Sequence, residues 1–234
     1  MDVLYFLKKR TAFIRQFYEV AAAPYLERQR KIVEGEEPFE QPSYYDEYSS
    51  GEPLHLEEYM EADESLHVLA YSCVSMLAAA LHLYFITWEG QFKTPARDLV
   101  KAQFKKGYLT GYQAYLTDYV GVSFKDCPAN IGLLEEVVIA RNCVQHPESS
   151  AENVWPITNI KTRYSTGDLK KLSTPFFLDE SERTALTEMD EAEGAWFTLP
   201  TLHVTGEKLI AAIDEVDKFC DWLEERIKNA VYKR

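Results

Sequence analysis

The feature that most constrains the fold is an uncharged stretch, residues 66–88, which contains no Asp, Glu, Lys or Arg. A stretch of this length could cross a bilayer as one helix. It could equally form the central helix of a bundle, which is apolar on every side. Two serines, a threonine and two histidines (His67 and His82) interrupt it, and neither end has the basic flanking residues that set a membrane orientation. We therefore expect a buried central helix and no membrane partner.

The composition predicts a folded, acidic protein. Hydrophobic residues make up 46% of the 234 and aromatic residues 13%, enough for a substantial core. A formal net charge of −13 argues against a broad nucleic-acid-binding surface, although a small local basic site is compatible with it. Four widely spaced cysteines predict free thiols in a reducing, cytoplasmic compartment, with no metal and no cofactor. Basic residues inside the apolar N-terminal stretch argue against a secretory signal.

The apolar periodicity predicts a mainly α fold, an up-and-down helical bundle in one domain over residues 1–234. Long helices are expected at 2–33, where Pro24 predicts a kink or break, and at 54–91. The expected parts of the domain are an N-terminal helix and loop (1–53), a bundle core with the motif helix (54–147), a small β insertion (150–204) and a closing helix (205–232).

Two threonines mark the expected starts of further helices. Thr94 is expected to cap a third helix with Pro95 in its first position, and a fourth short helix is expected within 107–121. Thr205 is expected to cap the closing helix. The third helix would carry the densest basic patch of the chain, which we interpret as a solvated helix face: Lys93, Arg97, Lys101, Lys105 and Lys106. The closing helix has a stripe expected to face the core: Leu209, Ile213, Val216, Cys220, Leu223 and Ile227.

Short β-like pieces separated by glycine, proline and acidic residues follow the motif helix. They predict a small hairpin or sheet inserted before the closing helix, with an acidic loop at 179–193. The pieces are 157–164, 175–178, 195–199 and 202–204.

The segment that carries candidate chemistry is Arg141-Asn142-Cys143-Val144-Gln145-His146, followed by Pro147, at the end of an apolar helix expected at 128–146. At 100° per residue, one stripe of this helix is apolar and faces the core: Leu133, Val137, Ala140 and Val144. Glu135, Asn142 and His146 fall on a roughly opposite polar stripe, and Arg141 lies between the two.

The end of this helix is suited to acid–base chemistry. Pro147 disfavours a helical conformation at His146, so the helix should stop there. At a helix C-terminus the dipole favours the charged imidazole, and a histidine with a raised pKa can donate a proton near neutral pH. A guanidinium, an amide and an imidazole within about one turn could together hold and cleave a phosphodiester.

These residues resemble the signature of the HEPN superfamily of α-helical proteins, an arginine followed by a polar residue and, four to six positions on, by histidine. The resemblance covers about 54–147, with 66–88 in the place of the family's central helix. It implies a metal-independent endoribonuclease that acts as a homodimer and leaves a 2′,3′-cyclic phosphate. By this resemblance His146 is the general acid or base, Arg141 binds the phosphate, and Asn142 orients the phosphate or the imidazole.

The resemblance also suggests partners and supporting residues. RNA would be the substrate, a toxin, phage-defence or stress system the setting, and a cognate inhibitor protein a further partner. Glu135 and His82 are candidate supporting residues, although His82 fits a satisfied core histidine more readily. The alternative function is that of a non-catalytic HEPN-like binding or scaffold protein that dimerises through the same helix.

Overall fold

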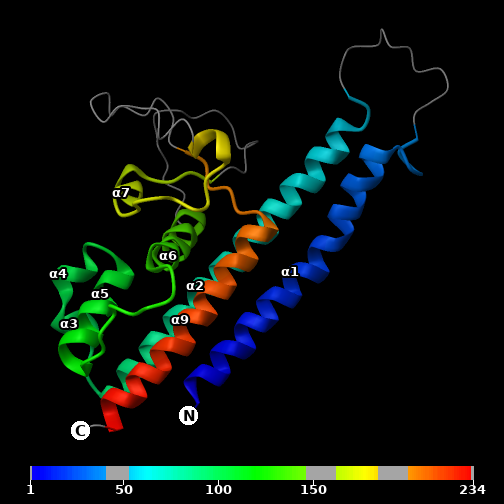
Figure 1. The fold of residues 1–234 in the computed structure, drawn as a ribbon. Coiled ribbons are helices and arrows are strands. Elements are labelled where there is room, and N and C mark those ends of the chain that lie inside the picture. Colours follow the sequence, from blue (N-terminus) through cyan, green and yellow to red (C-terminus); the bar gives the residue numbers. More distant parts are fainter. Residues whose placement is uncertain (1, 41–52, 146–161, 184–199, 233–234) are drawn as a thin grey trace.

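A computed structural model describes residues 2–40, 53–145, 162–183 and 200–232. Of the described residues 75% are helical, and none of them lies in a strand. The predicted mainly α fold with helical-bundle character is therefore confirmed. Figure 1 shows three long helices side by side, with shorter helices gathered along one flank.

Two of the long helices, α1 (Val3–Glu34) and α2 (Leu56–Phe92), form an antiparallel pair. Asp2 begins α1 by accepting a hydrogen bond from the Tyr5 backbone N–H at 2.9 Å. Of the kink or break predicted at Pro24, the break is wrong, because α1 continues through the proline. Proline removes the hydrogen bond to the carbonyl four residues earlier, and here that carbonyl belongs to Val20, which is 68% exposed and can be solvated.

The third long helix, α9 (Gly206–Tyr232), packs along α2. Its N-terminus is capped as predicted, since the Lys208 N–H donates to Thr205 Oγ1 at 3.3 Å. Every residue of its predicted core stripe is fully buried. Between the helices, the buried Tyr84 hydroxyl donates to a Glu224 carboxylate oxygen at 3.2 Å.

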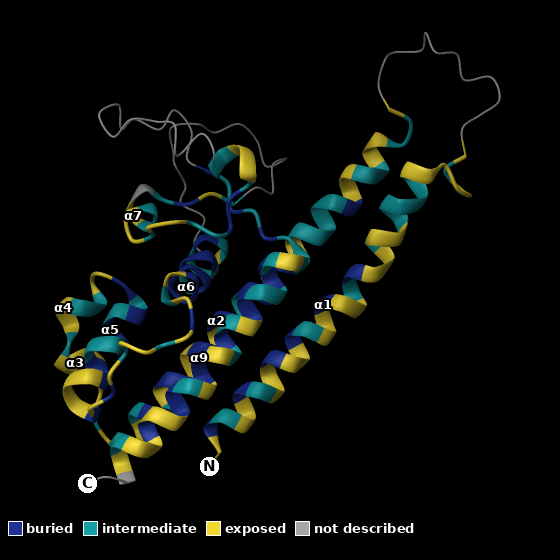
Figure 2. Cartoon of the chain, viewed as in Figure 1, coloured by how far each residue is buried: buried dark blue, intermediate teal, exposed yellow. Residues whose placement is uncertain are grey.

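The helix α2 is the centre of the bundle, as the uncharged stretch predicted. It packs against α1, α6 and α9, and twelve of its residues are buried. Among the described helices it is the one long and apolar enough to cross a membrane, and 56% of its most apolar window is buried inside the protein. Figure 2 shows this burial running along the faces that the three long helices share.

The expected third helix is instead two single turns, α3 (Ala96–Leu99) and α4 (Lys101–Phe104), separated at Val100. The predicted Thr94 cap is wrong, because the Thr94 hydroxyl donates to the Phe92 carbonyl. The Ala96 N–H is satisfied instead by a Glu89 carboxylate oxygen at 3.1 Å. The fourth helix is present as α5 (Tyr108–Tyr115), which continues into a π-helical turn, η1 (Leu116–Val120).

The predicted β hairpin insertion is not supported by the described part of 150–204. That part contains a short helix, α7 (Thr166–Leu169), and a single antiparallel bridge between Arg163 and Thr201. The backbone N–H groups of Phe176 and Phe177 donate to the buried Glu136 carboxylate at 2.6 and 2.8 Å, where a hairpin would need a partner strand. The expected strand at 195–199 lies outside the described residues.

Candidate functional site

The motif helix is α6 (Ile131–Gln145), and Asn130 begins it by accepting from the Leu133 N–H at 3.1 Å. Leu133, Val137 and Ala140 are buried as predicted, whereas Val144 is half-buried. Ile139 and Cys143 are buried as well, so other elements cover α6 on more than one side (Figure 2). His146 lies outside the described residues.

Arg141 and Asn142 lie half-buried in the last turn of α6. The Arg141 Nη1 group donates to Asn142 Oδ1 at 2.9 Å, so the two predicted site residues are already joined. Asn142 also lines a cavity of about 200 Å³, and two cationic side chains from other elements, Arg97 and Lys171, line it with Asn142. The motif amide and two positive charges therefore share one hollow.

His82 is an exposed residue, so its interpretation as a satisfied core histidine is wrong. Its Nδ1 lies 2.7 Å from the hydroxyl of Tyr108, which lines the same cavity as Asn142. Partial burial lowers the pKa of His82 below its usual value, and the positive charges of Arg97 and Arg141 lower it further, opposed by Glu89. His82 therefore lies beside the Tyr108 wall of this cavity, and its supporting role stays a prediction.

The prediction that Glu135 lies on an exposed polar stripe is wrong. The residue is buried, with 7% of its surface exposed. Its carboxylate accepts from the backbone N–H groups of Tyr108 and Leu109 at 2.7 and 2.6 Å and thereby caps α5. A side chain at Gly107 would crowd it, since a Cβ there would lie 2.9 Å from Glu135 Oε2. Glu135 therefore positions Tyr108 at the cavity and is not free to act on a ligand.

Sequence reasoning missed Glu136, which is 1% exposed and holds the 162–178 segment against α6. Besides the two phenylalanine N–H groups, it accepts from the Tyr164 hydroxyl at 2.6 Å. Burial raises the pKa of Glu136, opposed by these hydrogen bonds. The signal that could have revealed both buried carboxylates is that Glu135-Glu136 stands between apolar runs on each side. The segment held by Glu136 includes Lys171, which no sequence pattern connects with Asn142.

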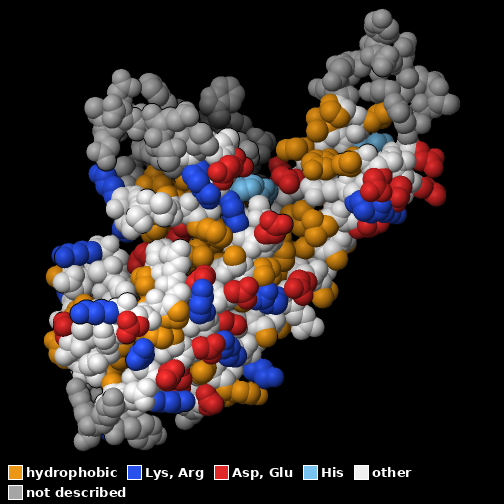
Figure 3. Space-filling view, viewed as in Figure 1, with side chains coloured by type: hydrophobic (Ala, Val, Ile, Leu, Met, Phe, Trp, Pro, Cys, Tyr) orange, Lys and Arg blue, Asp and Glu red, His pale blue; other side chains and the backbone are white. Residues whose placement is uncertain are grey.

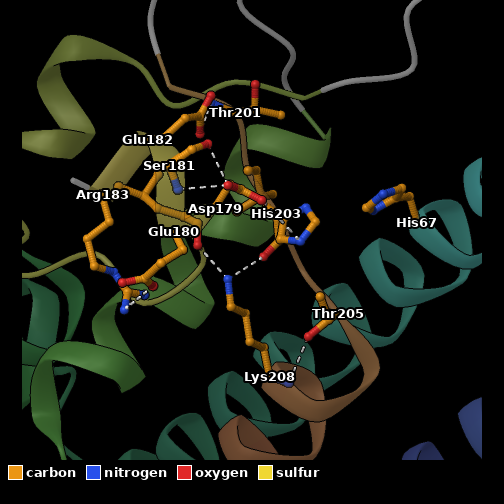
Figure 4. Close-up of polar contacts among 12 residues, drawn as sticks. His67, Asp179, Glu180, Ser181, Glu182, Arg183, Thr201, His203, Thr205 and Lys208 are labelled. Atoms are coloured by element: carbon orange, nitrogen blue, oxygen red, sulfur yellow. Dashed lines mark hydrogen bonds and ion pairs between the residues drawn. The ribbon is translucent and has the colours of Figure 1, made fainter. Parts of the chain in front are cut away.

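A second polar cavity, of about 430 Å³, lies between α2 and the residues that lead into α9. The rings of His67 and His203 lie close together there, with centroids 5.3 Å apart and their planes inclined at 58°. His67 Nε2 lies 3.4 Å from Asp63, and His203 Nε2 lies 3.9 Å from Asp179 (Figure 4). Within the described ranges, no group of three or more His, Cys, Asp or Glu side chains is arranged to hold a metal ion.

Hydrogen bonds fix the backbone beneath this second cavity. The His203 N–H donates to the Phe177 carbonyl at 2.7 Å, and Lys208 Nζ donates to the carbonyls of Leu178 and His203 at 2.5 and 3.4 Å (Figure 4). Its lining includes four carboxylates (Asp63, Glu64, Asp179 and Glu182). The second cavity is therefore acidic, in contrast to the hollow beside Asn142.

No protein-family model matches this chain, and no curated protein or solved structure is significantly similar to it.

Proposed function

We propose that this protein is a HEPN-type, metal-independent endoribonuclease that acts as a homodimer with a composite site of Arg141, Asn142 and His146. The observation that carries the proposal is the position of Asn142. It follows Arg141 directly in the last turn of α6 and lines a hollow with Arg97 and Lys171. Positive charge beside the motif, in a chain with a net charge of −13, is what a phosphodiester substrate needs.

In the proposed reaction the RNA 2′-oxygen attacks the neighbouring phosphorus, and the bond from phosphorus to the 5′-oxygen breaks. The products are a 2′,3′-cyclic phosphate and a 5′-hydroxyl. One imidazole takes the proton from the 2′-hydroxyl and another gives a proton to the leaving 5′-oxygen, which requires His146 of both subunits. Arg141 stabilises the negative charge that develops on the phosphoryl oxygens.

The need for two acid–base groups is the reason for proposing a dimer. One copy of the motif supplies one imidazole and one motif guanidinium, whereas two copies facing across a two-fold axis supply two of each. The proposed setting is a cytoplasmic toxin, phage-defence or stress system, in which a cognate inhibitor protein would cover the same helix end.

A non-catalytic binding or scaffold function is the second candidate, and one contact favours it. The Arg141 guanidinium donates to the Asn142 amide oxygen, so in the free chain the two side chains are hydrogen-bonded to each other. A substrate phosphate would have to compete with that hydrogen bond. The scaffold function predicts dimerisation through α6 without cleavage.

Cleavage of end-labelled RNA in EDTA tests the proposal. Wild type should generate 2′,3′-cyclic phosphate ends, and His146→Ala or Arg141→Ala should lower the rate at least about 100-fold, the range typical for loss of a general acid–base group. His67→Ala, in the acidic cavity, is the matched control and should cleave like wild type. Equal RNA integrity in wild type and the two site variants would contradict the nuclease. A protein that is monomeric by light scattering at micromolar concentration would contradict the composite site.

A further inference from the structure

We infer that a basic groove along α3 and α4 binds the phosphates of single-stranded RNA that flank the cleaved bond; this rests on the proposed function. The groove consists of two adjoining hollows that share Arg97 and Phe104. The first is the cavity that contains Asn142, Tyr108 and Lys171. The second, of about 270 Å³, is lined by Lys101 and Lys105 together with Asp98.

The shared wall of the groove is held in place by packing. The Arg97 guanidinium carbon lies over the Phe104 ring, 5.9 Å from its centre. The Phe104 ring packs onto α5 at Gly111, where a Cβ would lie 2.3 Å from a ring carbon. Glycine at this position therefore allows the ring, and with it the guanidinium, to lie between the two hollows. Arg97 is thus a positioned charge, unlike a lysine that moves freely on a helix surface.

The charge in the groove is positive even after its acidic neighbours are counted. Its lining contains four cationic side chains, Arg97, Lys101, Lys105 and Lys171, and two carboxylates, Asp98 and Glu135. Glu135 is occupied by two backbone N–H groups. Outside the lining, Asp168 pairs with Lys171 at 2.8 Å. Figure 3 shows Lys and Arg side chains over the α3–α4 and α7 side of the molecule.

The form of the groove favours a flexible single strand. Successive phosphates of one strand can contact the cations of both hollows, Lys171 in the first, Lys101 and Lys105 in the second, and Arg97 between them. A long duplex would extend beyond this small basic area onto a chain whose net charge is −13. The groove therefore supplies sequence-tolerant affinity next to the residues proposed to cleave.

Binding of 2′-O-methyl RNA, which lacks the attacking hydroxyl, separates affinity from cleavage. Fluorescence anisotropy across a salt series should show weaker binding for the double variant Lys101→Ala/Lys105→Ala than for wild type. Its salt slope should fall by about 1.4, since each phosphate contact on a single strand contributes about 0.7. Both lysines are exposed, so the variant should keep the wild-type melting temperature. Lys101→Arg/Lys105→Arg should bind like wild type, as should the control Lys9→Ala/Lys218→Ala on α1 and α9.

The proposal that the groove binds RNA would be overturned if Lys101→Ala/Lys105→Ala had the same affinity and salt slope as the control. The two proposals can fail separately. If wild type binds through these lysines but leaves unmodified RNA intact, the nuclease fails and the groove stands. If wild type cleaves RNA and the double variant cleaves it with the same KM, the groove fails and the nuclease stands.

Discussion

The basic hollow at Asn142 and the acidic cavity at His67 and His203 differ in charge and in how they hold their ionisable groups. The hollow at Asn142 has Arg97 and Lys171 in its wall, and its glutamate is used to cap α5. The cavity at His67 and His203 contains four carboxylates, and each histidine lies near an aspartate. The net charge of −13 therefore has the sign of the second cavity but not that of the hollow at Asn142. An anionic ligand fits only the first of the two.

Two adjacent glutamates on α6, Glu135 and Glu136, hold the segments that form the two cavities. Glu135 accepts hydrogen bonds from the start of α5 on the side of the basic hollow. Glu136 accepts from Tyr164, Phe176 and Phe177, and the Phe177 carbonyl in turn accepts from the His203 N–H. One helix therefore supports both cavities through two buried carboxylates.

The largest effect is expected from Glu136→Ala. The change leaves a buried tyrosine hydroxyl and two backbone N–H groups without their acceptor, so we expect a loss of about 3 kcal/mol in the free energy of unfolding. Both cavities should lose their shape, because the segment that carries Lys171 and supports His203 is released. Urea unfolding measures the loss, and the NMR signals of His82 and His203 report on the two cavities.

The matched control is Glu135→Ala on the same helix. It removes a cap from α5 and should cost about 1 kcal/mol. It should also disturb the surroundings of His82 while leaving those of His203 unchanged. A smaller loss of stability for Glu136→Ala than for Glu135→Ala would contradict the assignment of Glu136 as the anchor of the segment.

A smaller effect is expected on the pKa values of His82, beside the basic hollow, and His203, in the acidic cavity. Burial lowers the pKa of both His82 and His203. The charge of Arg97 adds to this at His82 and that of Lys208 at His203, where Asp179 acts in the opposite direction. We therefore expect Arg97→Ala to raise the pKa of His82 and Asp179→Asn to lower that of His203 further. An NMR titration of the imidazole carbons measures both changes.

The sign of the pH dependence follows from these pKa values. An unfolded chain binds protons at these histidines near pH 6.5, whereas the folded protein resists protonation until lower pH. The contribution of these two histidines to the free energy of unfolding is therefore fully present above about pH 6.5 and is lost as the pH falls below that value. A pKa above 6.5 for either histidine in wild type, or a His82 pKa unchanged by Arg97→Ala, would contradict the electrostatic description.

The long helices could be predicted from sequence because their signals are local and repeated. The stripe from Leu209 to Ile227 and the Thr205 cap both depend on residues close in the chain. The predicted hairpin is not supported by the described residues, because the N–H groups of Phe176 and Phe177 find their acceptor on α6, a contact that no local pattern reveals.

The same limit applies to the candidate site. The hydrogen bond from Arg141 to Asn142 does not follow from adjacency in the last turn of α6, because neighbouring residues of a helix do not face each other. The contributions of Arg97 and Lys171 to the hollow depend on how distant segments pack. Helical periodicity predicts an exposed position for Glu135, because it does not show that α5 covers that side of α6.

Hydrogen exchange with and without 2′-O-methyl RNA tests the central claim most directly, because it reports on both cavities in one protein. We predict slower exchange at 97–108 and 138–145, which form the basic groove and the motif end of α6. We predict no change at 60–71 and 200–205, which line the acidic cavity. Protection at 60–71 and 200–205 with none at 97–108 would contradict the account.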